Sequence, residues 1–437
     1  MTKGPTKKSS HISLLAAIAV GVGAMIGAGI FSIIGVVAGV SGSALPIVFI
    51  LGAVITILSV YSYSKLGASL PSVGGPVVFL VRGFGDGVLS GGLNIFQYLA
   101  YVISLALYAS GFAAYAVVFF SNPPQWWTKA FAIGVVLAFV VVNFIGAALM
   151  GKAEIYIVAT KVAILVSFAV IGLFFVQGAR LSPSDWKPPV DILFAAAIAF
   201  IGFQGFGLIT NTAGDMKNPK RDLPRALYIS FATATIVYVL VAITVIGTTS
   251  MSTITGSTGD VLSVVAQGFL GKLGFYALAV AALLSTASAV NATLFGSANI
   301  AYQVAKEGEL PKEMFMEKLW HRNVEGLFLT AAFVIGLLLA FNLAPISMMA
   351  SGAFLIVYAA VNAAHMRITK ETGARLWIIG LATVLTGAMF FVLLVYMVRS
   401  APRIAWITLV VLFVVSFMIE WVYRRLSGRS LKNVLPK

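Results

Sequence analysis

One charged side chain of this 437-residue chain lies deep inside an apolar stretch. Lys161 stands about eight residues, or roughly 12 Å of helix, from the nearer end of a hydrophobic run at 153–178. An ammonium group so far from water is expensive, and ionisable residues in such places are usually functional. We therefore expect Lys161 to load and release a proton, its charge standing in for a bound cation. The alternative is a lysine that reaches the surface or stays paired with backbone carbonyls.

Glycines gather at two places in the chain. Each glycine in a helix costs about 1 kcal/mol relative to alanine, so a cluster favours an interruption of the helix. Matched clusters in the first and sixth apolar runs, five spans apart, are typical of inverted repeats with broken helices. The alternative is that glycine only lets helices pack closely. The clusters are Gly21, Gly23, Gly27 and Gly29 in the first run, and Gly202, Gly205 and Gly207 in the sixth.

An interrupted helix leaves backbone groups free in the middle of the membrane. Each unpaired group inside a bilayer is costly unless something binds it. Free N–H groups suit a carboxylate, and free carbonyls suit an ammonium group. Two breaks that meet therefore predict a site for a zwitterion such as an α-amino acid, which glycine allows to approach the backbone closely.

The composition places these residues in a membrane. Of all residues 60% are hydrophobic and 10% are charged, whereas soluble domains carry about 25% charged residues, so a soluble enzyme is excluded. The net charge of +15 is spread between apolar runs, which argues against a nucleic-acid partner. The sequence contains no cysteine, carboxylate pair, metal-ligand cluster or nucleophile–base arrangement. We expect no catalytic residue, no metal and no cofactor.

Twelve apolar runs are long enough to span a bilayer as helices, since about 20 residues suffice. They predict one all-α polytopic membrane domain over 1–437. Residues 12–178 would form helices 1–5, residues 191–366 helices 6–10, and residues 375–423 helices 11–12, between tails at 1–11 and 424–437. The runs cover 12–38, 43–69, 86–120, 129–150, 153–178, 191–213, 224–248, 264–305, 325–342, 345–366, 375–398 and 403–423.

Positive charges predict the orientation of the chain. With the N-terminus inside the cell, the cytoplasmic segments hold 22 of the 29 lysine and arginine residues, and the external segments hold six. Because cytoplasmic loops carry the excess of positive charge, we expect both termini in the cytoplasm. The inner or plasma membrane of the cell is the expected location.

Other polar residues carry weaker signals. Glu420 lies near the end of the twelfth run and His365 at a loop edge, where interfacial or solvated side chains are expected. Tyr98, Tyr101 and Tyr108 share one face of the third run, which favours packing over a substrate wall. Gln204 is too isolated in the sequence to be assigned a role.

Three motifs resemble those of the amino acid–polyamine–organocation (APC) superfamily. They are GAMIGAGIF at 23–31 in helix 1, DMKNPKRDLPR at 215–225 between helices 6 and 7, and NIAYQVAKEGELP at 299–311 at the end of helix 8. With its lysine in helix 5, the chain is most similar to the ApcT branch of proton-coupled amino-acid transporters. The resemblance implies a LeuT-like fold of five plus five inverted helices with two appended, in which helices 1 and 6 are broken.

The resemblance also implies where ligands bind. The substrate carboxylate would bind at the helix-1 break and the amino group at helix-6 carbonyls, while the ring of Phe203 would control access from outside. Sodium-coupled relatives hold an ion between helices 1, 5 and 8; here Lys161, near Gly23 and Ser285, would take its place, so no bound sodium is expected. The implied substrate residues are Met25, Gly27, Ala28 and Gly29 in helix 1, and Ile198, Ala199, Ile201 and Phe203 in helix 6.

We therefore expect a secondary transporter, not an enzyme, that imports neutral amino acids with protons by alternating access across the lipid bilayer. Two alternatives stay open. One is an exchanger that swaps one amino acid for another without protons, and the other is a sensor that binds amino acids without transporting them.

Overall fold

The computed structural model describes residues 12–146, 150–257, 259–306 and 325–429. Within these residues, twelve helical spans follow the twelve predicted runs; eleven are long and apolar enough to cross a membrane, and α13 is a shorter apolar helix. Apart from the sixth, the spans are α1 (Leu14–Ser41), α2 (Leu45–Ser69), α4 (Val88–Ala116), α5 (Trp126–Gly146), α6 (Met150–Leu173), α9 (Pro219–Thr248), α11 (Val261–Lys306), α13 (Glu325–Ala340), α14 (Leu343–Arg367), α16 (Leu376–Ser400) and α17 (Arg403–Leu426).

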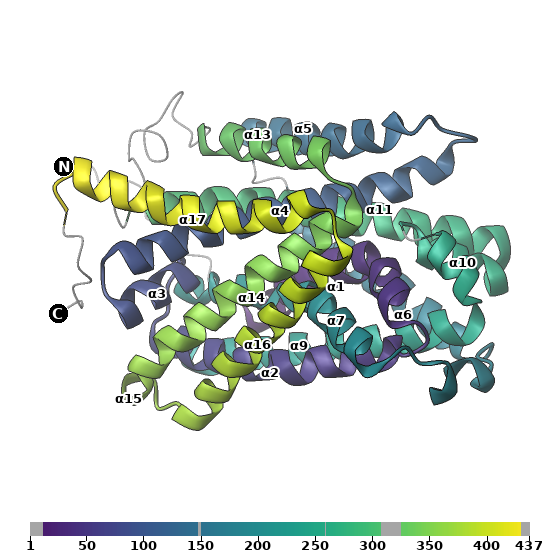
Figure 1. Cartoon of the computed structure of the whole chain (residues 1–437), viewed down its shortest axis with the longest axis horizontal. Coiled ribbons are helices and arrows are strands. Elements are labelled where there is room, and N and C mark those ends of the chain that lie inside the picture. Colours follow the sequence, from purple (N-terminus) through teal and green to yellow (C-terminus); the bar gives the residue numbers. More distant parts are fainter. Residues whose placement is uncertain (1–11, 147–149, 258, 307–324, 430–437) are drawn as a thin grey trace, which may run out of the picture.

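Short elements join the spans at two opposite ends of the bundle. In Figure 1, α3 (Pro76–Phe84) and α15 (Thr369–Thr372) lie toward the left, whereas α10 (Met251–Gly256) lies far to the right. We call these the α3 end and the α10 end. The remaining connections contain the 3-10 turns η1 (Val117–Phe119), η3 (Gly178–Leu181), η4 (Pro183–Asp185) and η6 (Ala213–Asp215).

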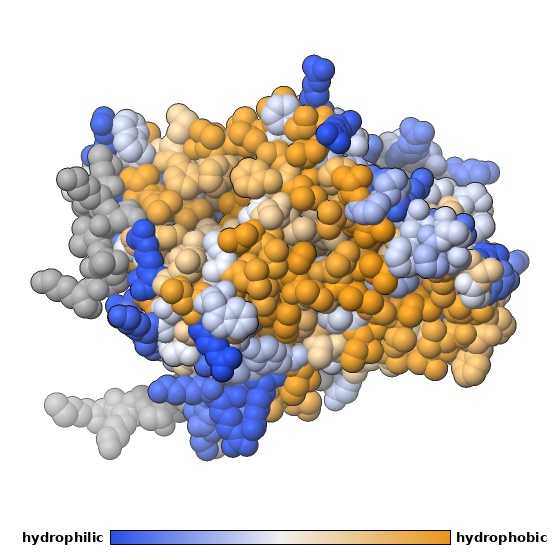
Figure 2. Space-filling view, turned by 60° about the horizontal axis from the view of Figure 1, so that its bottom comes forward, coloured by the Kyte–Doolittle hydropathy of each residue, from blue (hydrophilic) through white to orange (hydrophobic). Residues whose placement is uncertain are grey.

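The surface fits a chain surrounded by lipid. Hydrophobic residues cover most of the middle of the face shown in Figure 2, and hydrophilic residues gather at its margins. The long eighth run is divided rather than straight, because Gly271 in α11 adopts a φ of +64°. A left-handed conformation of this kind suits glycine, and it turns the start of α11 away from the rest of the helix.

The sixth span is interrupted, as predicted. Its first half is α7 (Pro189–Ala199), followed by the 3-10 segment η5 (Phe200–Phe203), a turn at Gln204 and Gly205, and the short helix α8 (Phe206–Thr210). The glycine cluster coincides with the point where the α-helical hydrogen-bond pattern is lost. This agrees with the low helix propensity of glycine.

The predicted break in helix 1 is wrong: the described chain forms a single helix over Leu14–Ser41. The glycines of α1 allow close packing instead. A Cβ added to Gly21 would lie 2.3 Å from the side chain of Ile209, and one added to Gly29 would lie 2.6 Å from the Cα of Gly202. Contacts with the sixth span therefore offset the low helix propensity of these glycines, and α1 keeps its helical conformation.

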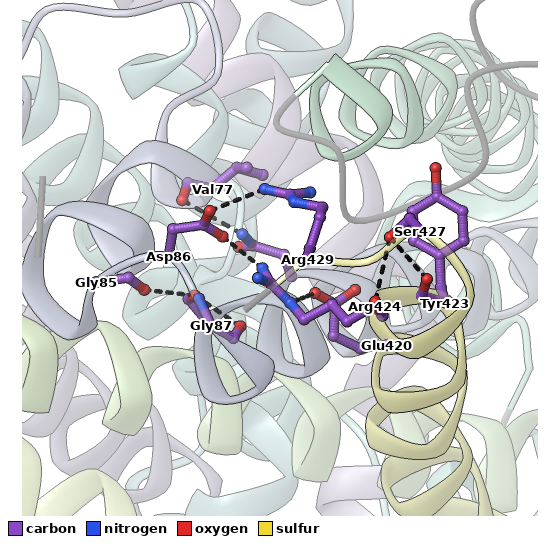
Figure 3. A network of polar contacts seen from close by, with 11 residues as sticks. Val77, Gly85, Asp86, Gly87, Glu420, Tyr423, Arg424, Ser427 and Arg429 are labelled. Atoms are coloured by element: carbon purple, nitrogen blue, oxygen red, sulfur yellow. Dashed lines mark hydrogen bonds and ion pairs between the residues drawn. The ribbon is translucent and has the colours of Figure 1, made fainter. Parts of the chain in front are cut away.

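A charged network joins α17 to the start of α4 (Figure 3). Arg424 pairs with Glu420 on its own helix and with Asp86, which stands between α3 and α4. Arg429 adds a second contact to Asp86 at 2.8 Å. Burial alone would raise the pKa of the Asp86 carboxyl, but hydrogen bonds and positive charge from the two arginines outweigh it and hold that pKa below its usual value.

Glu420 and Arg424 are fully buried, so the expectation of an interfacial Glu420 is wrong. The acid was expected at the surface because it lies near the end of its run. Its side chain is instead packed so tightly against α4 that a Cβ on Gly91 would lie 2.2 Å from its Oε1. A buried pair of this kind needs its partners, because removing one leaves an uncompensated charge.

Candidate functional site

Lys161 of α6 is fully buried, and its ammonium group reaches α1. The Nζ atom donates a hydrogen bond to the carbonyl oxygen of Gly23 over 2.9 Å. A Cβ on Gly27 would lie 2.6 Å from the same nitrogen, so glycine at this position leaves room for the ammonium group. The lysine is thus held against two glycines of α1 that lie one turn apart.

Ser285 of α11 contacts the same part of α1. Its hydroxyl donates to the carbonyl oxygen of Gly27 over 2.9 Å, and the side chain is fully buried. Helices α1, α6 and α11 therefore meet at one point, and the structure brings Lys161, Gly23 and Ser285 together there. This geometry lets a change in the protonation of Lys161 act directly on α1.

The interrupted span crosses α1 where both carry glycine. A Cβ on Gly205 would lie 2.6 Å from the backbone nitrogen of Met25, and a Cβ on Gly29 would lie 2.8 Å from the carbonyl oxygen of Gly202. Backbone therefore meets backbone at two levels of the crossing. Such close approach brings the carbonyls of the sixth span within reach of the residues of α1 that were predicted to bind a carboxylate.

Protein hydroxyl groups bind carbonyl oxygens around the interruption. Two spans, α9 and α14, contribute them, so three of the acceptors expected at a break have partners in this structure. Such bonds satisfy the backbone where water is excluded. Ser351 of α14 donates to Ala197 over 2.5 Å, Tyr238 of α9 to Gly202 over 2.8 Å, and Tyr358 of α14 to Gln204 over 2.6 Å.

Tyr238 links the two crossing spans. Its hydroxyl oxygen lies 2.8 Å from the carbonyl oxygen of Gly202 and 2.5 Å from that of Met25. A phenol has one proton to donate, so it can bond only one of these carbonyls at a time. The pair of carbonyls can therefore accept a further donor, and a substrate ammonium group has the chemistry to provide it.

Phe203 lies in the middle of an aromatic cluster rather than at an open entrance. Its ring packs against Tyr238 at 5.2 Å, Phe231 at 5.5 Å and Phe49 at 6.5 Å between ring centroids. Gly52 of α2 faces the same ring, and a Cβ there would lie 3.2 Å from it. The side chain is fully buried.

The predicted substrate residues all lie in the two crossing spans, and their roles stay predictions. The side chain of Ala28 lies outside the described residues, although its backbone is part of α1. The other seven are buried: Met25, Gly27, Gly29, Ile198, Ala199, Ile201 and Phe203.

Four candidate residues were missed or discounted by the sequence reasoning: Gln204, Tyr108, Tyr238 and Tyr358. Gln204 donates from its Nε2 to the hydroxyl of Tyr108 over 2.6 Å, so it is not isolated. Tyr108 was read as packing, and the other two tyrosines were not singled out. The sequence feature that could have identified these four residues is a hydroxyl or amide group inside an otherwise apolar span.

His365 is a further correction. It was expected in solvent but is fully buried near the α3 end of α14. Its Nδ1 lies 2.8 Å from the hydroxyl of Ser62, and its Nε2 lies 2.8 Å from the hydroxyl of Thr372. Both ring nitrogens thus have neutral partners, which ties α2, α14 and α15 together.

Comparison with known proteins decides the family. The sequence profile described as amino acid permease matches residues 12–419. The chain belongs to the amino acid permease family. The APC resemblance is confirmed, and the members of this family are transporters rather than enzymes.

Two relatives and one solved structure resemble this chain over more than nine-tenths of its length. The chain is 38% identical to an uncharacterized protein of Methanocaldococcus jannaschii over 98% of each sequence. It is 31% identical to the inner membrane transport protein YbaT of Escherichia coli, over 93% of this chain and 95% of that protein. A manganese transporter of Eremococcus coleocola superimposes with a TM-score of 0.59 at 13% identity, covering 98% of this chain and 96% of the other, and it supports the LeuT-like fold alone.

Proposed function

We propose that this permease imports neutral amino acids together with protons, by alternating access across the cell membrane. The observation that carries the proposal is the buried ammonium group of Lys161, bonded to the carbonyl oxygen of Gly23 in α1. A buried charge is costly unless it is paired. Loss of the proton therefore weakens the tie between α6 and α1, and regaining it restores that tie.

The substrate in this proposal binds where α1 crosses the interrupted sixth span. Its ammonium group shares the carbonyls of Met25 and Gly202 with the hydroxyl of Tyr238, and its carboxylate approaches α1 beside Gly27 and Gly29. The supporting evidence is the 2.5 Å and 2.8 Å contacts of the Tyr238 hydroxyl, which mark two acceptors for one proton. Recognition is then mainly between backbone and zwitterion.

A neutral substrate side chain fits the groups around the crossing. Phe203, Phe49 and Ile201 are apolar and fully buried or nearly so, and they offer no charge to pair with a charged substrate side chain. Competition of labelled alanine uptake by each of the twenty amino acids checks this. Aliphatic amino acids are expected to compete, whereas strong competition by lysine or aspartate would contradict it.

The proposed orientation places the α3 end in the cytoplasm. Two positively charged segments of the described chain, 217–225 and 367–375, lie there. A proton gradient directed into the cell would then load Lys161 from the α10 side and unload it toward the α3 side. No bound sodium enters this cycle, since the ammonium group supplies the positive charge.

Uptake in proteoliposomes tests the coupling. With an inside-alkaline pH gradient and no sodium, the unmodified transporter is expected to accumulate labelled alanine at least about tenfold above equilibrium, which corresponds to about 1.4 kcal/mol. Lys161→Ala is expected to abolish this accumulation while keeping alanine counterflow. Lys272→Ala is the control, because Lys272 is an exposed lysine of α11.

Three outcomes would contradict proton symport. Undiminished uphill uptake by the Lys161→Ala variant would remove the coupling role of the lysine. Counterflow that ignores the pH gradient, without net uptake, would make the protein an exchanger. Binding of amino acids without any flux would make it a sensor.

A further inference from the structure

Six polar or hydroxyl-bearing side chains follow one face of α4. Their positions are separated alternately by four and three residues, so they lie above one another on the helix. All are buried, although apolar residues would pack in a helical interior more cheaply. They are Ser90, Asn94, Gln97, Tyr101, Ser104 and Tyr108.

This face of α4 points toward the centre of the transporter. The hydroxyl of Tyr108 accepts a hydrogen bond from Gln204 in the interrupted span, and the ring of Tyr101 packs on Phe354 of α14 at 5.1 Å. A different face of α4 meets α17, where Phe96 packs on Phe413 at 5.0 Å. The polar face is therefore the one that continues from the candidate substrate site.

Register places Gln97 on the α3 side of that site. Helix α4 starts near the α3 end and α14 finishes there, so the two run in opposite directions. One turn from the Tyr101–Phe354 contact toward the α3 end leads to Gln97 on α4 and to Tyr358 on α14. Gln97 thus lies level with Tyr358, whose ring packs against both sides of the interruption of the sixth span.

Tyr358 is the centre of an aromatic plug, which we define as Tyr63, Phe200, Phe206, Phe354 and Tyr358. Its ring lies 4.9–5.8 Å from each of the other four, measured between centroids. Two of those rings, Phe200 and Phe206, stand on either side of the interruption. The Tyr358 hydroxyl also bonds the carbonyl of Gln204 between them, over 2.6 Å.

Buried polar atoms without hydrogen-bond partners occur in the plug itself, on α14 and at Gln97 of α4. Among the described residues, neither amide atom of Gln97 has a hydrogen-bond partner, nor has the hydroxyl of Tyr63 or the Oδ1 of Asn362. Each of the three side chains is 1% exposed or less. Leaving such a group unsatisfied costs about 1–3 kcal/mol, and most buried polar groups in native structures are paired. The unsatisfied groups on α2, α4 and α14 therefore indicate a second conformation of the transporter, in which these groups have hydrogen-bond partners.

We propose that the Gln97 face of α4 lines the substrate pathway between the central site and the α3 end, and that the aromatic plug closes this pathway here. The inference rests on the proposed alternating access and adds the route of release. When the plug separates, Gln97, Tyr63 and Asn362 gain water or substrate as partners. A glutamine amide both donates and accepts, so Gln97 can bond either end of a passing zwitterion.

Accessibility of an introduced thiol tests the pathway, because the chain contains no cysteine of its own. Gln97→Cys is compared with Ile95→Cys, which is also buried, at 3% exposure, but lies on the opposite face of α4. Purified protein is treated with a small charged methanethiosulfonate, with and without Tyr358→Ala. Modification at position 97 is expected to accelerate at least about tenfold with Tyr358→Ala, whereas position 95 stays unreactive.

Equal rates at positions 95 and 97, with no effect of Tyr358→Ala, would overturn the pathway. The measurement does not depend on transport. Alanine flux with an unreactive Gln97→Cys therefore refutes only this inference, while a reactive, plug-dependent Gln97→Cys without flux of any amino acid refutes only the proposed function.

Gln97→Leu provides a second readout. Removing an unsatisfied amide is expected to raise the thermal stability of the closed protein, yet to slow alanine counterflow about tenfold because the released substrate loses a polar partner. A residue that merely filled space would change stability and flux in the same direction. Unchanged counterflow in a stabilised variant would contradict the proposed contact with substrate.

Discussion

At the scale of single residues, Lys161 and Gly27 depend on each other. A Cβ added to Gly27 would lie 2.6 Å from the Nζ of Lys161. A Cβ and a nitrogen that are not bonded to each other do not approach so closely, so one of them would have to move. Because Gly27 has no side chain, the ammonium group of Lys161 has room to bind beside α1.

Gly27→Ala is expected to displace the Lys161 ammonium group and to reduce proton-driven alanine accumulation at least about tenfold, because the Nζ–Gly23 bond can no longer form at its present length. Gly39→Ala is the matched control, since Gly39 lies in the same helix with nothing within 4 Å of an added Cβ. Uptake in proteoliposomes measures both variants. Normal accumulation by Gly27→Ala would show that proton-driven uptake does not require the ammonium group of Lys161 at its present position.

The sequence predicted only some of these residues, for physical reasons. A lysine in an apolar run is conspicuous because burying its charge is costly, and Lys161 could be found that way. Tyr238 could not, since tyrosine in a membrane helix usually packs through its ring, and only the fold shows that its hydroxyl meets Met25 and Gly202. Gln97 is conspicuous as a polar residue in an apolar run, but the sequence does not show whether its face of the helix points to the centre of the bundle or to the lipid.

At the scale of elements, hydropathy placed the twelve spans well because lipid requires a fixed length of apolar helix. The conformation inside a span was harder to predict. The glycine clusters of α1 and of the sixth span look alike in sequence, yet α1 stays helical and the sixth span does not. The propensity of glycine is a small term, about 1 kcal/mol per residue, and packing decides between the two outcomes.

The charged network gives α17 a definite attachment. Arg424→Met is expected to lower the free energy of unfolding by about 3–5 kcal/mol, because it leaves Glu420 buried without its partner. Arg424→Met combined with Glu420→Leu is expected to recover most of that loss. Thermal unfolding in detergent compares them, and a double variant no more stable than Arg424→Met would refute the pairing as the cause.

Asp260, between α10 and α11, is expected to make stability depend on pH. Burial raises the pKa of its carboxyl to about 6, above the value of about 3.9 expected in an unfolded chain. The folded state therefore prefers the protonated form, and stability falls as pH rises from about 4 to about 6, then levels off.

Asp260→Asn is expected to remove this dependence and to raise the melting temperature at pH 7.5 more than at pH 4. Asp185→Asn is the control, because Asp185 is an exposed acid at the same end of the bundle. Melting curves recorded in detergent at both pH values measure the effect. An equal shift at the two values would exclude Asp260 as the titrating group.

At the scale of the whole molecule, the proposed orientation can be tested with two exposed positions. Ser252 in α10 and Lys370 in α15 lie at opposite ends of the bundle. In intact cells, an impermeant maleimide is expected to label Ser252→Cys, and to label Lys370→Cys only after lysis. The reverse pattern would invert the topology, and with it the direction of release through the aromatic plug.

The contacts of α1 have a consequence for how easily that helix unwinds. Lys161 and Ser285 donate hydrogen bonds to the carbonyl oxygens of Gly23 and Gly27, and the hydroxyl of Tyr238 lies 2.5 Å from the carbonyl oxygen of Met25; these partners lie on three other helices. If the helical turn at this level opened, those oxygens would keep a partner instead of standing bare in a dry interior. Local unwinding at the centre of α1 therefore costs less free energy than in a span whose carbonyls bond only within the helix. Such unwinding would expose the peptide dipoles that a zwitterion needs.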